Sequence, residues 1–161
     1  MQHVGNQRGK CSVLIIPPDR ADVQTRRKRM KILLVDDSEA DLYLFQEAFR
    51  AVQSVHELGI ARDGEGVLQH LHAAEGEHLP ELIMLDLNLP KVDGFEVLRA
   101  IRADPKLRVI PVIVLSSSSN ERQVYRAYEM GANAYVVKPM NDFVDLVGDL
   151  ERFWLRRAEL P

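Results

Sequence analysis

Short apolar runs alternate with helix-like patterns along most of this chain. Residues 31–35 are almost continuously apolar, which is typical of a strand buried on both faces. The strand candidates are residues 31–35, 57–61, 82–85, 112–115 and 134–137. Apolar residues at helical spacing follow each run, and polar residues that favour helix starts are Ser38, Asn120 and Asn141. The pattern therefore predicts five successive strand–helix units.

Alternation of strands and helices defines the fold class. Such units form a parallel sheet with helices on both faces, so we expect an α/β fold. Sheets of this kind bind ligands at the carboxyl ends of their strands. The strand ends carry Asp36, Asp37, Asp86, Ser116 and Lys138. Function is therefore expected at this edge.

Composition places the chain among globular proteins. It has 161 residues, 46% of them apolar and 28% charged, which suits one domain that folds unaided. Its single cysteine, Cys11, excludes an internal disulfide. The apolar runs are far shorter than the roughly 20 residues that span a bilayer, and a secretory signal is missing. We therefore predict a cytoplasmic protein with no membrane segment.

Charge is distributed unevenly along the chain. The net charge is -3, but residues 1–30 carry +5 and the remainder carries -8. An acidic folded region disfavours nucleic-acid binding, although a basic tail that binds nucleic acid stays an alternative. We interpret residues 1–29 as a basic, disordered leader.

Three carboxylates are expected to meet at the strand ends, because Asp36, Asp37 and Asp86 each follow an apolar run. Like charges brought together repel unless a cation neutralises them. Oxygen ligands suit Mg²⁺ or Mn²⁺. One such Asp alone would be read as a turn or helix-cap residue, but the joint occurrence with Ser116 and Lys138 favours a divalent metal site.

The residues at the strand ends resemble the signature of receiver domains of two-component response regulators. The matching residues are Asp36-Asp37, Asp86 within Leu-Asp-Leu-Asn-Leu-Pro, Asp93-Gly94, Ser116, Gly131-Ala132 and Lys138-Pro139. The resemblance covers about residues 31–155, so we assign residues 30–155 to a receiver domain. It implies a flavodoxin-like, doubly wound sheet of five parallel strands in the order 2-1-3-4-5.

The resemblance also implies a phosphoryl-transfer site. Asp86 would be the nucleophile that accepts a phosphoryl group from the histidine of a partner histidine kinase. Asp37 and Asp86 would hold Mg²⁺ directly, with the backbone carbonyl of Asn88 as a further ligand. Asp36 would act mostly through water.

Four further residues would complete the resemblance. Lys138 would contact the phosphoryl group, and Ser116 would donate a hydrogen bond to it. Movement of Ser116 would let Tyr135 turn inward, which converts a local charge change into a surface change. The Lys138–Pro139 bond would be a cis peptide.

An apolar segment, Phe153, Trp154 and Leu155, lies at the end of the last predicted helix. Exposed aromatic patches usually mark interfaces, so we predict that this segment docks on a second copy to form a homodimer. Core packing of Trp154 is the alternative. Residues 156–161 form a tail that would join the dimer contact and are too few for a DNA-binding or catalytic domain, so the protein is expected to signal by binding rather than act as an enzyme.

A narrower resemblance concerns the kinase. Residues 128–133, the Asp104-Pro105 turn and the Phe-Trp-Leu segment are similar to free-standing receivers that serve bacterial and cyanobacterial phytochrome histidine kinases. This resemblance implies a bacteriophytochrome as the partner, so that light would set the phosphorylation of Asp86.

Three other functions are alternatives, and for each of them one feature of the sequence argues against it. A pseudo-receiver would bind partners without phosphorylation, but the intact acidic set and Lys138 argue against it. A flavodoxin-like electron carrier needs a phosphate loop where this chain has the acidic residues 36–39. A metal-dependent phosphohydrolase would carry a second Asp in place of Asn88.

Overall fold

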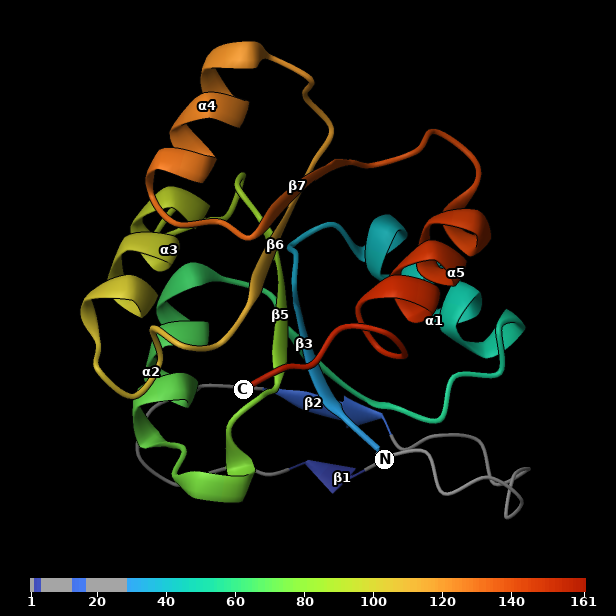
Figure 1. Ribbon diagram of the computed structural model, residues 1–161, viewed down its shortest axis with the longest axis horizontal. Helices are drawn as coiled ribbons and strands as arrows, with labels where there is room; N and C mark the ends of the chain where they lie inside the picture. The colour runs from blue at the N-terminus through green and yellow to red at the C-terminus, as the bar shows by residue number, and fades with distance from the viewer. Residues whose placement is uncertain (1, 4–12, 17–28) are drawn as a thin grey trace.

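A single mixed sheet with helices on both faces organises the chain (Figure 1). The computed structural model describes residues 2–3, 13–16 and 29–161. Its strands are β1 (Gln2–His3), β2 (Leu14–Ile16), β3 (Lys31–Val35), β4 (Glu57–Ala61), β5 (Leu82–Asp86), β6 (Val112–Ser116) and β7 (Ala134–Val137). The helices are α1 (Glu39–Ala51), α2 (Gly64–Ala73), α3 (Gly94–Ala103), α4 (Glu121–Glu129), α5 (Phe143–Phe153) and the short 3₁₀ helix η1 (Gly76–His78).

The sheet order is β1-β2-β4-β3-β5-β6-β7. The five strands from β4 to β7 are all parallel and follow the order 2-1-3-4-5, which confirms the predicted fold class. In Figure 1, α1 and α5 cover one face of this sheet and α2, α3 and α4 cover the other. No helix within the described ranges is long and apolar enough to cross a lipid bilayer.

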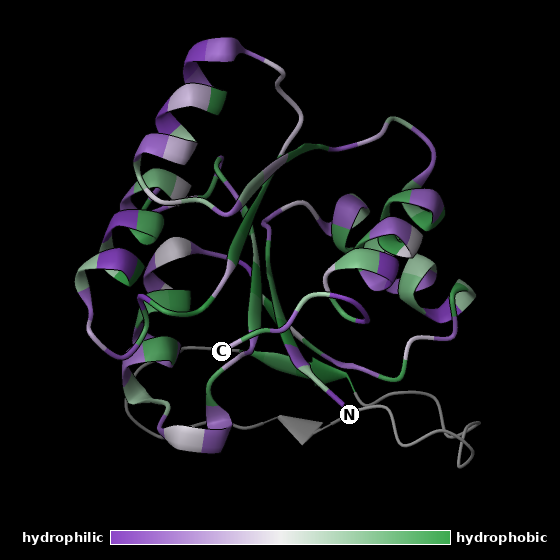
Figure 2. Cartoon of the chain, in the orientation of Figure 1, coloured by the Kyte–Doolittle hydropathy of each residue, from purple (hydrophilic) through white to green (hydrophobic). Residues whose placement is uncertain are grey.

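Alternating residues of the central strands fill two separate cores. In β3, Leu33 and Val35 pack on the side of α2 and α3, whereas Ile32 and Leu34 pack on the side of α1 and α5. Every residue of β5 and β6 is buried. Figure 2 shows these strands as the most hydrophobic part of the chain. The nearly continuous apolar runs in the sequence result from this two-sided burial.

The segment before β3 departs from the prediction. Strand β2 pairs antiparallel with β4, with Leu14 opposite Ile60, and Val13 is buried. Residues 2–3 and 14–16, which fall within the predicted leader, form strands β1 and β2 and extend the sheet beyond β4. Most of the predicted leader, residues 4–12 and 17–28, lies outside the described residues.

Side-chain caps set the starts of the helices. The Ser38 Oγ accepts a hydrogen bond from the Asp41 backbone N–H at 3.2 Å, which begins α1 as predicted. Asn120 caps α4, also as predicted. For α5 the predicted start, Asn141, is one residue too early, because the carboxylate of Asp142 accepts from the backbone N–H three residues later. Asp and Asn are similarly good caps, so sequence did not separate them.

A buried polar contact joins the end of α5 to the start of β4. The Nε2 atom of His56 lies 3.5 Å from Glu151 Oε2, and the backbone N–H of Met30 donates to His56 Nδ1 at 3.1 Å. Burial would raise the pKa of Glu151, but hydrogen bonds with His56 and Ser54 outweigh it and hold the pKa below its ordinary value. The charged form of Glu151 therefore stabilises this end of the molecule.

Replacing Glu151 by Gln should destabilise the protein by about 1–3 kcal/mol at pH 7. Because its pKa is lowered on folding, the carboxylate contributes stability above the ordinary value of 4.5 and loses it as pH falls through the lowered value. Urea unfolding of wild type and Glu151→Gln, at pH 7 and near pH 4, measures the difference in unfolding free energy at each pH. Glu159→Gln, at an exposed position, is the control. An unchanged difference at the two pH values would contradict this account.

Candidate functional site

The carboxyl ends of four parallel strands bring the predicted polar residues together. Asp36 and Asp37 follow β3, Asp86 ends β5, Ser116 ends β6, and Lys138 follows β7. The chain passes from β3 to β4 on one side and later to β5 on the other, so the order reverses beside β3. Ligand sites of doubly wound sheets occur at such a reversal. The structure therefore brings the predicted strand-end residues together at one edge of the sheet.

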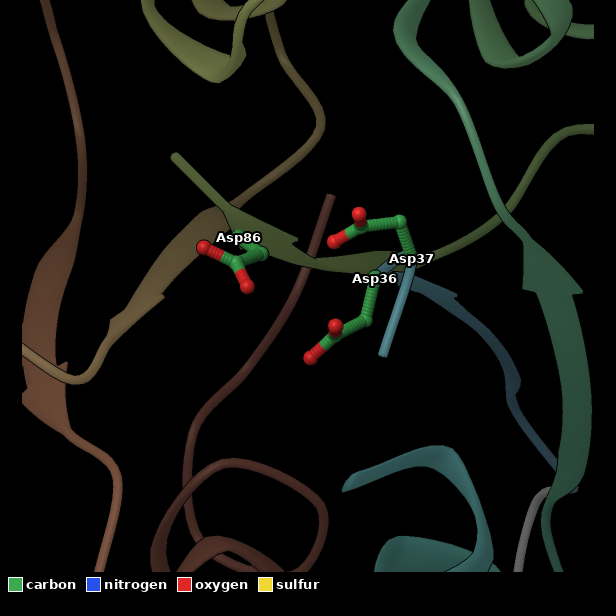
Figure 3. A group of neighbouring side chains, drawn as sticks. All are labelled: Asp36, Asp37 and Asp86. Atoms are coloured by element: carbon green, nitrogen blue, oxygen red, sulfur yellow. The ribbon is translucent and has the colours of Figure 1, made fainter. Parts of the chain in front are cut away.

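Three of the carboxylates face a common space, as Figure 3 shows. Oxygen atoms of Asp36, Asp37 and Asp86 all lie within 4.8 Å of one another. Asp36 and Asp86 are buried, whereas Asp37 is exposed. The donor set contains only oxygen and is open on one side, which fits a divalent cation that keeps some of its water, such as Mg²⁺ or Mn²⁺.

Lys138 supplies positive charge to this cluster. Its Nζ lies 2.6 Å from Asp36 Oδ2, 2.7 Å from Asp86 Oδ2 and 2.8 Å from Asp41 Oδ2. Burial by itself would lower the pKa of Lys138, but the hydrogen bonds with these three carboxylates raise it well above the ordinary value. The ammonium group is therefore a permanent cation with all three of its N–H donors in use.

Asp36 is the most deeply buried acid of the site. Burial raises its pKa, and hydrogen bonds with Lys138 and with the backbone N–H of Ser38 oppose that effect. The Ser38 N–H lies 2.9 Å from Asp36 Oδ1. Burial of a charged carboxylate away from water costs free energy. A cation bound beside Asp36 would therefore lower the cost of keeping this carboxylate charged.

Asp86 is held in a fixed orientation. Its Oδ1 accepts from the backbone N–H of Asn88 at 2.9 Å, while its Oδ2 faces Lys138. Gly94 allows the loop after β5 to return closely, because a Cβ there would lie 2.3 Å from the backbone oxygen of Asp86. Asn88 itself is exposed beside the carboxylate.

Ser116 and Tyr135 are linked through the backbone of Ser118. The buried Ser116 Oγ accepts from the backbone N–H of Ser118 at 3.1 Å. The Tyr135 hydroxyl donates to the backbone oxygen of Ser118 at 2.8 Å. Both residues of the predicted switch are therefore linked to the same short loop after β6.

Three findings correct or extend the sequence predictions. The Lys138–Pro139 bond is trans, as are all peptide bonds in the described residues, so the predicted cis peptide is wrong. Trp154 and Leu155 pack partly against their own core, whereas Phe153 is 57% exposed. Asp41 contacts Lys138 at 2.8 Å, and the sequence analysis did not predict Asp41 as a residue of the site.

Comparison with known proteins identifies the family. The response regulator receiver domain matches residues 32–150, and the chain belongs to this family. Response regulator Rcp1 of Synechocystis is 46% identical over 136 residues, which cover 81% of this chain and 92% of Rcp1. Family membership confirms the resemblance inferred from the strand-end residues.

Two solved structures are similar over the same region. The Mn²⁺-bound form of Rcp1 has a TM-score of 0.74 at 45% identity, covering 82% of this chain and 99% of that one. The phosphorylated cyanobacterial phytochrome response regulator RcpA has a TM-score of 0.76 at 44% identity, covering 83% and 99%. This chain is therefore similar to phytochrome-associated response regulators.

Proposed function

We propose that this protein is a response regulator that accepts a phosphoryl group on Asp86 from a histidine kinase. One observation carries the proposal: the Asp86 carboxylate lies 2.7 Å from the Lys138 ammonium and within 4.8 Å of the oxygens of Asp36 and Asp37. This arrangement combines a nucleophile with the positive charge and the metal ligands that phosphoryl transfer needs.

The transfer step follows from the orientation of Asp86. One carboxylate oxygen attacks the phosphorus of the phosphohistidine, so that a P–O bond forms while the P–N bond breaks. The imidazole leaves with the electron pair and takes up a proton on the kinase. Lys138 faces the same carboxylate and stabilises charge on the phosphoryl oxygens. A divalent cation held by Asp37, Asp86 and the Asn88 carbonyl, with Asp36 acting mostly through water, would supply further positive charge.

We infer that phosphorylation is read by the loop after β6. The Ser116 hydroxyl can donate to a phosphoryl oxygen while it moves away from the Ser118 N–H that now donates to it. Tyr135 is hydrogen-bonded to the same loop and would follow this movement. The surface around β7 and α4 would then differ between the two states.

We propose a phytochrome-type histidine kinase as the phosphodonor, which places the reaction in the cytoplasm, where such kinases obtain ATP. The similarity to RcpA, a cyanobacterial phytochrome response regulator, supports this. The test incubates the protein with autophosphorylated, radiolabelled kinases of phytochrome and other types. Label should reach this chain from the phytochrome-type kinase within seconds to minutes. Transfer from other kinases only would contradict this partner.

We also propose a homodimer in which Phe153 contacts a second copy, with residues 156–161 beside it. Phe153 is a large exposed aromatic residue whose ring lies 5.4 Å from that of Trp154. Wild type should be a dimer by light scattering at micromolar concentration, and Phe153→Ser a folded monomer, because an exposed side chain contributes little to the fold of one copy. A monomeric wild type, with or without phosphorylation, would contradict the dimer.

A further inference from the structure

The ammonium group of Lys138 binds carboxylates from three different segments. Asp36 follows β3, Asp86 ends β5, and Asp41 lies in the first turn of α1. The contact with Asp41, at 2.8 Å, is nearly as short as those with Asp36 and Asp86, at 2.6 and 2.7 Å. An ammonium group has three N–H donors, so each of the three carboxylates, Asp41 included, can accept one hydrogen bond from Lys138.

Asp41 differs from the other two partners in its place. The group of carboxylates suited to a metal ion contains Asp36, Asp37 and Asp86, but not Asp41. Its backbone N–H donates to the Ser38 Oγ, so the helix cap fixes the position from which its side chain reaches Lys138. Its side chain is 28% exposed, in contrast to the buried Asp36.

These differences matter once a cation and a phosphoryl group are present. A divalent cation would draw on Asp86 directly and on Asp36 mostly through water, and phosphorylation would turn one oxygen of Asp86 into the bridging oxygen of an acyl phosphate. Both changes would weaken the hydrogen bonds that Asp36 and Asp86 accept from the Lys138 ammonium group. Asp41 is left as the partner whose charge the reaction does not alter.

We propose that Asp41 is a positioning residue that keeps the Lys138 ammonium beside Asp86 throughout metal binding and phosphoryl transfer. The proposal rests on the proposed function of Asp86. Asp41 acts through Lys138 and does not touch the reacting atoms. It also ties the chain after β7 to the first turn of α1, because the two residues belong to these segments.

A double-mutant cycle tests whether Asp41 acts through Lys138. The variants are Asp41→Ala, Lys138→Met and the combination of both. Glu39→Ala is the matched control, since Glu39 lies in the same helical turn, carries the same charge and pairs with Arg62 at 2.8 Å. The rate of phosphorylation by acetyl phosphate at saturating Mg²⁺ is measured for each by intact mass.

Asp41→Ala should slow phosphorylation about tenfold, within the range found for residues that orient a site from outside it. Glu39→Ala should change the rate by less than about twofold, because surface charges act weakly on distant sites. When Lys138 is already Met, removal of Asp41 should have no further effect beyond that of the control. Equal slowing by Asp41→Ala in both backgrounds, or a rate equal to that of Glu39→Ala, would overturn the proposal.

Mn²⁺ binding, measured by electron paramagnetic resonance, gives a second readout that needs no phosphorylation. Without Asp41, the ammonium would bind only Asp36 and Asp86 and compete more strongly with the cation. Asp41→Ala should therefore weaken Mn²⁺ binding more when Lys138 is present than when it is Met. If wild type takes up no phosphoryl group, the proposed function of Asp86 fails. An equal loss of Mn²⁺ affinity on Asp41→Ala, with Lys138 and with Met at position 138, would overturn the role of Asp41.

Discussion

Asp86→Asn is expected to abolish phosphorylation by acetyl phosphate, with a rate at least about 10³-fold below that of wild type. An amide cannot form the acyl phosphate, and the other acids nearby lack the orientation of Asp86. The Asn88 N–H and Lys138 hold its two oxygens separately at 2.9 and 2.7 Å. Intact mass after incubation with acetyl phosphate and Mg²⁺ measures the result.

The matched control for this variant is Asp149→Asn, which changes an exposed carboxylate on α5 that pairs with Arg152. It should be phosphorylated at the wild-type rate. Circular dichroism should show that both variants are folded. A phosphoryl group gained by folded Asp86→Asn would mean that another residue is the acceptor.

Lys138→Met is expected to lower the free energy of unfolding by about 3 kcal/mol in EDTA at pH 7. The substitution removes the ammonium group that pairs with Asp36, Asp41 and Asp86, and leaves the buried carboxylates of Asp36 and Asp86 without a cation. Addition of Mg²⁺ should restore most of the lost stability, because the ion would supply positive charge to the buried carboxylates of Asp36 and Asp86. Phosphorylation should slow by about 10²–10³-fold, as for other groups that stabilise transition-state charge.

Lys91→Met is the control, since Lys91 is exposed and pairs with Asp63 at 3.3 Å. Its unfolding free energy should change by less than about 0.5 kcal/mol, with or without Mg²⁺. Urea titrations in EDTA and in Mg²⁺ provide these values. A destabilised Lys138→Met protein that Mg²⁺ does not rescue would show that the cation and Lys138 do not share the carboxylates.

The parallel core was predictable because a strand that is buried on both faces appears in the sequence as a short, nearly continuous apolar run. All five residues of β5 are buried, and each face of the strand contributes to a different core. Strand β2 gives no such signal, because it is only three residues long and all three are half-buried. Its strand character depends on pairing with β4, from residues more than forty positions away. Such a contact cannot be inferred from a short apolar run.

The site was predictable where it depends on topology and less so where it depends on side-chain direction. Parallel strands fix which ends meet, so Asp36, Asp86 and Lys138 were found from the sequence. Asp41 lies on a helix, and only the fold shows that its carboxylate reaches Lys138. Whether Trp154 packs inward depends on how α5 docks, which its sequence pattern does not determine.

The most direct test of the central claim is the mass of the wild-type protein after incubation with acetyl phosphate, with Mg²⁺ and with EDTA, followed by peptide mapping. We predict the gain of one phosphoryl group that requires the divalent cation and maps to the peptide containing Asp86. Absence of phosphorylation of folded protein with Mg²⁺, or a phosphoryl group on a peptide without Asp86, would contradict the assignment of this site.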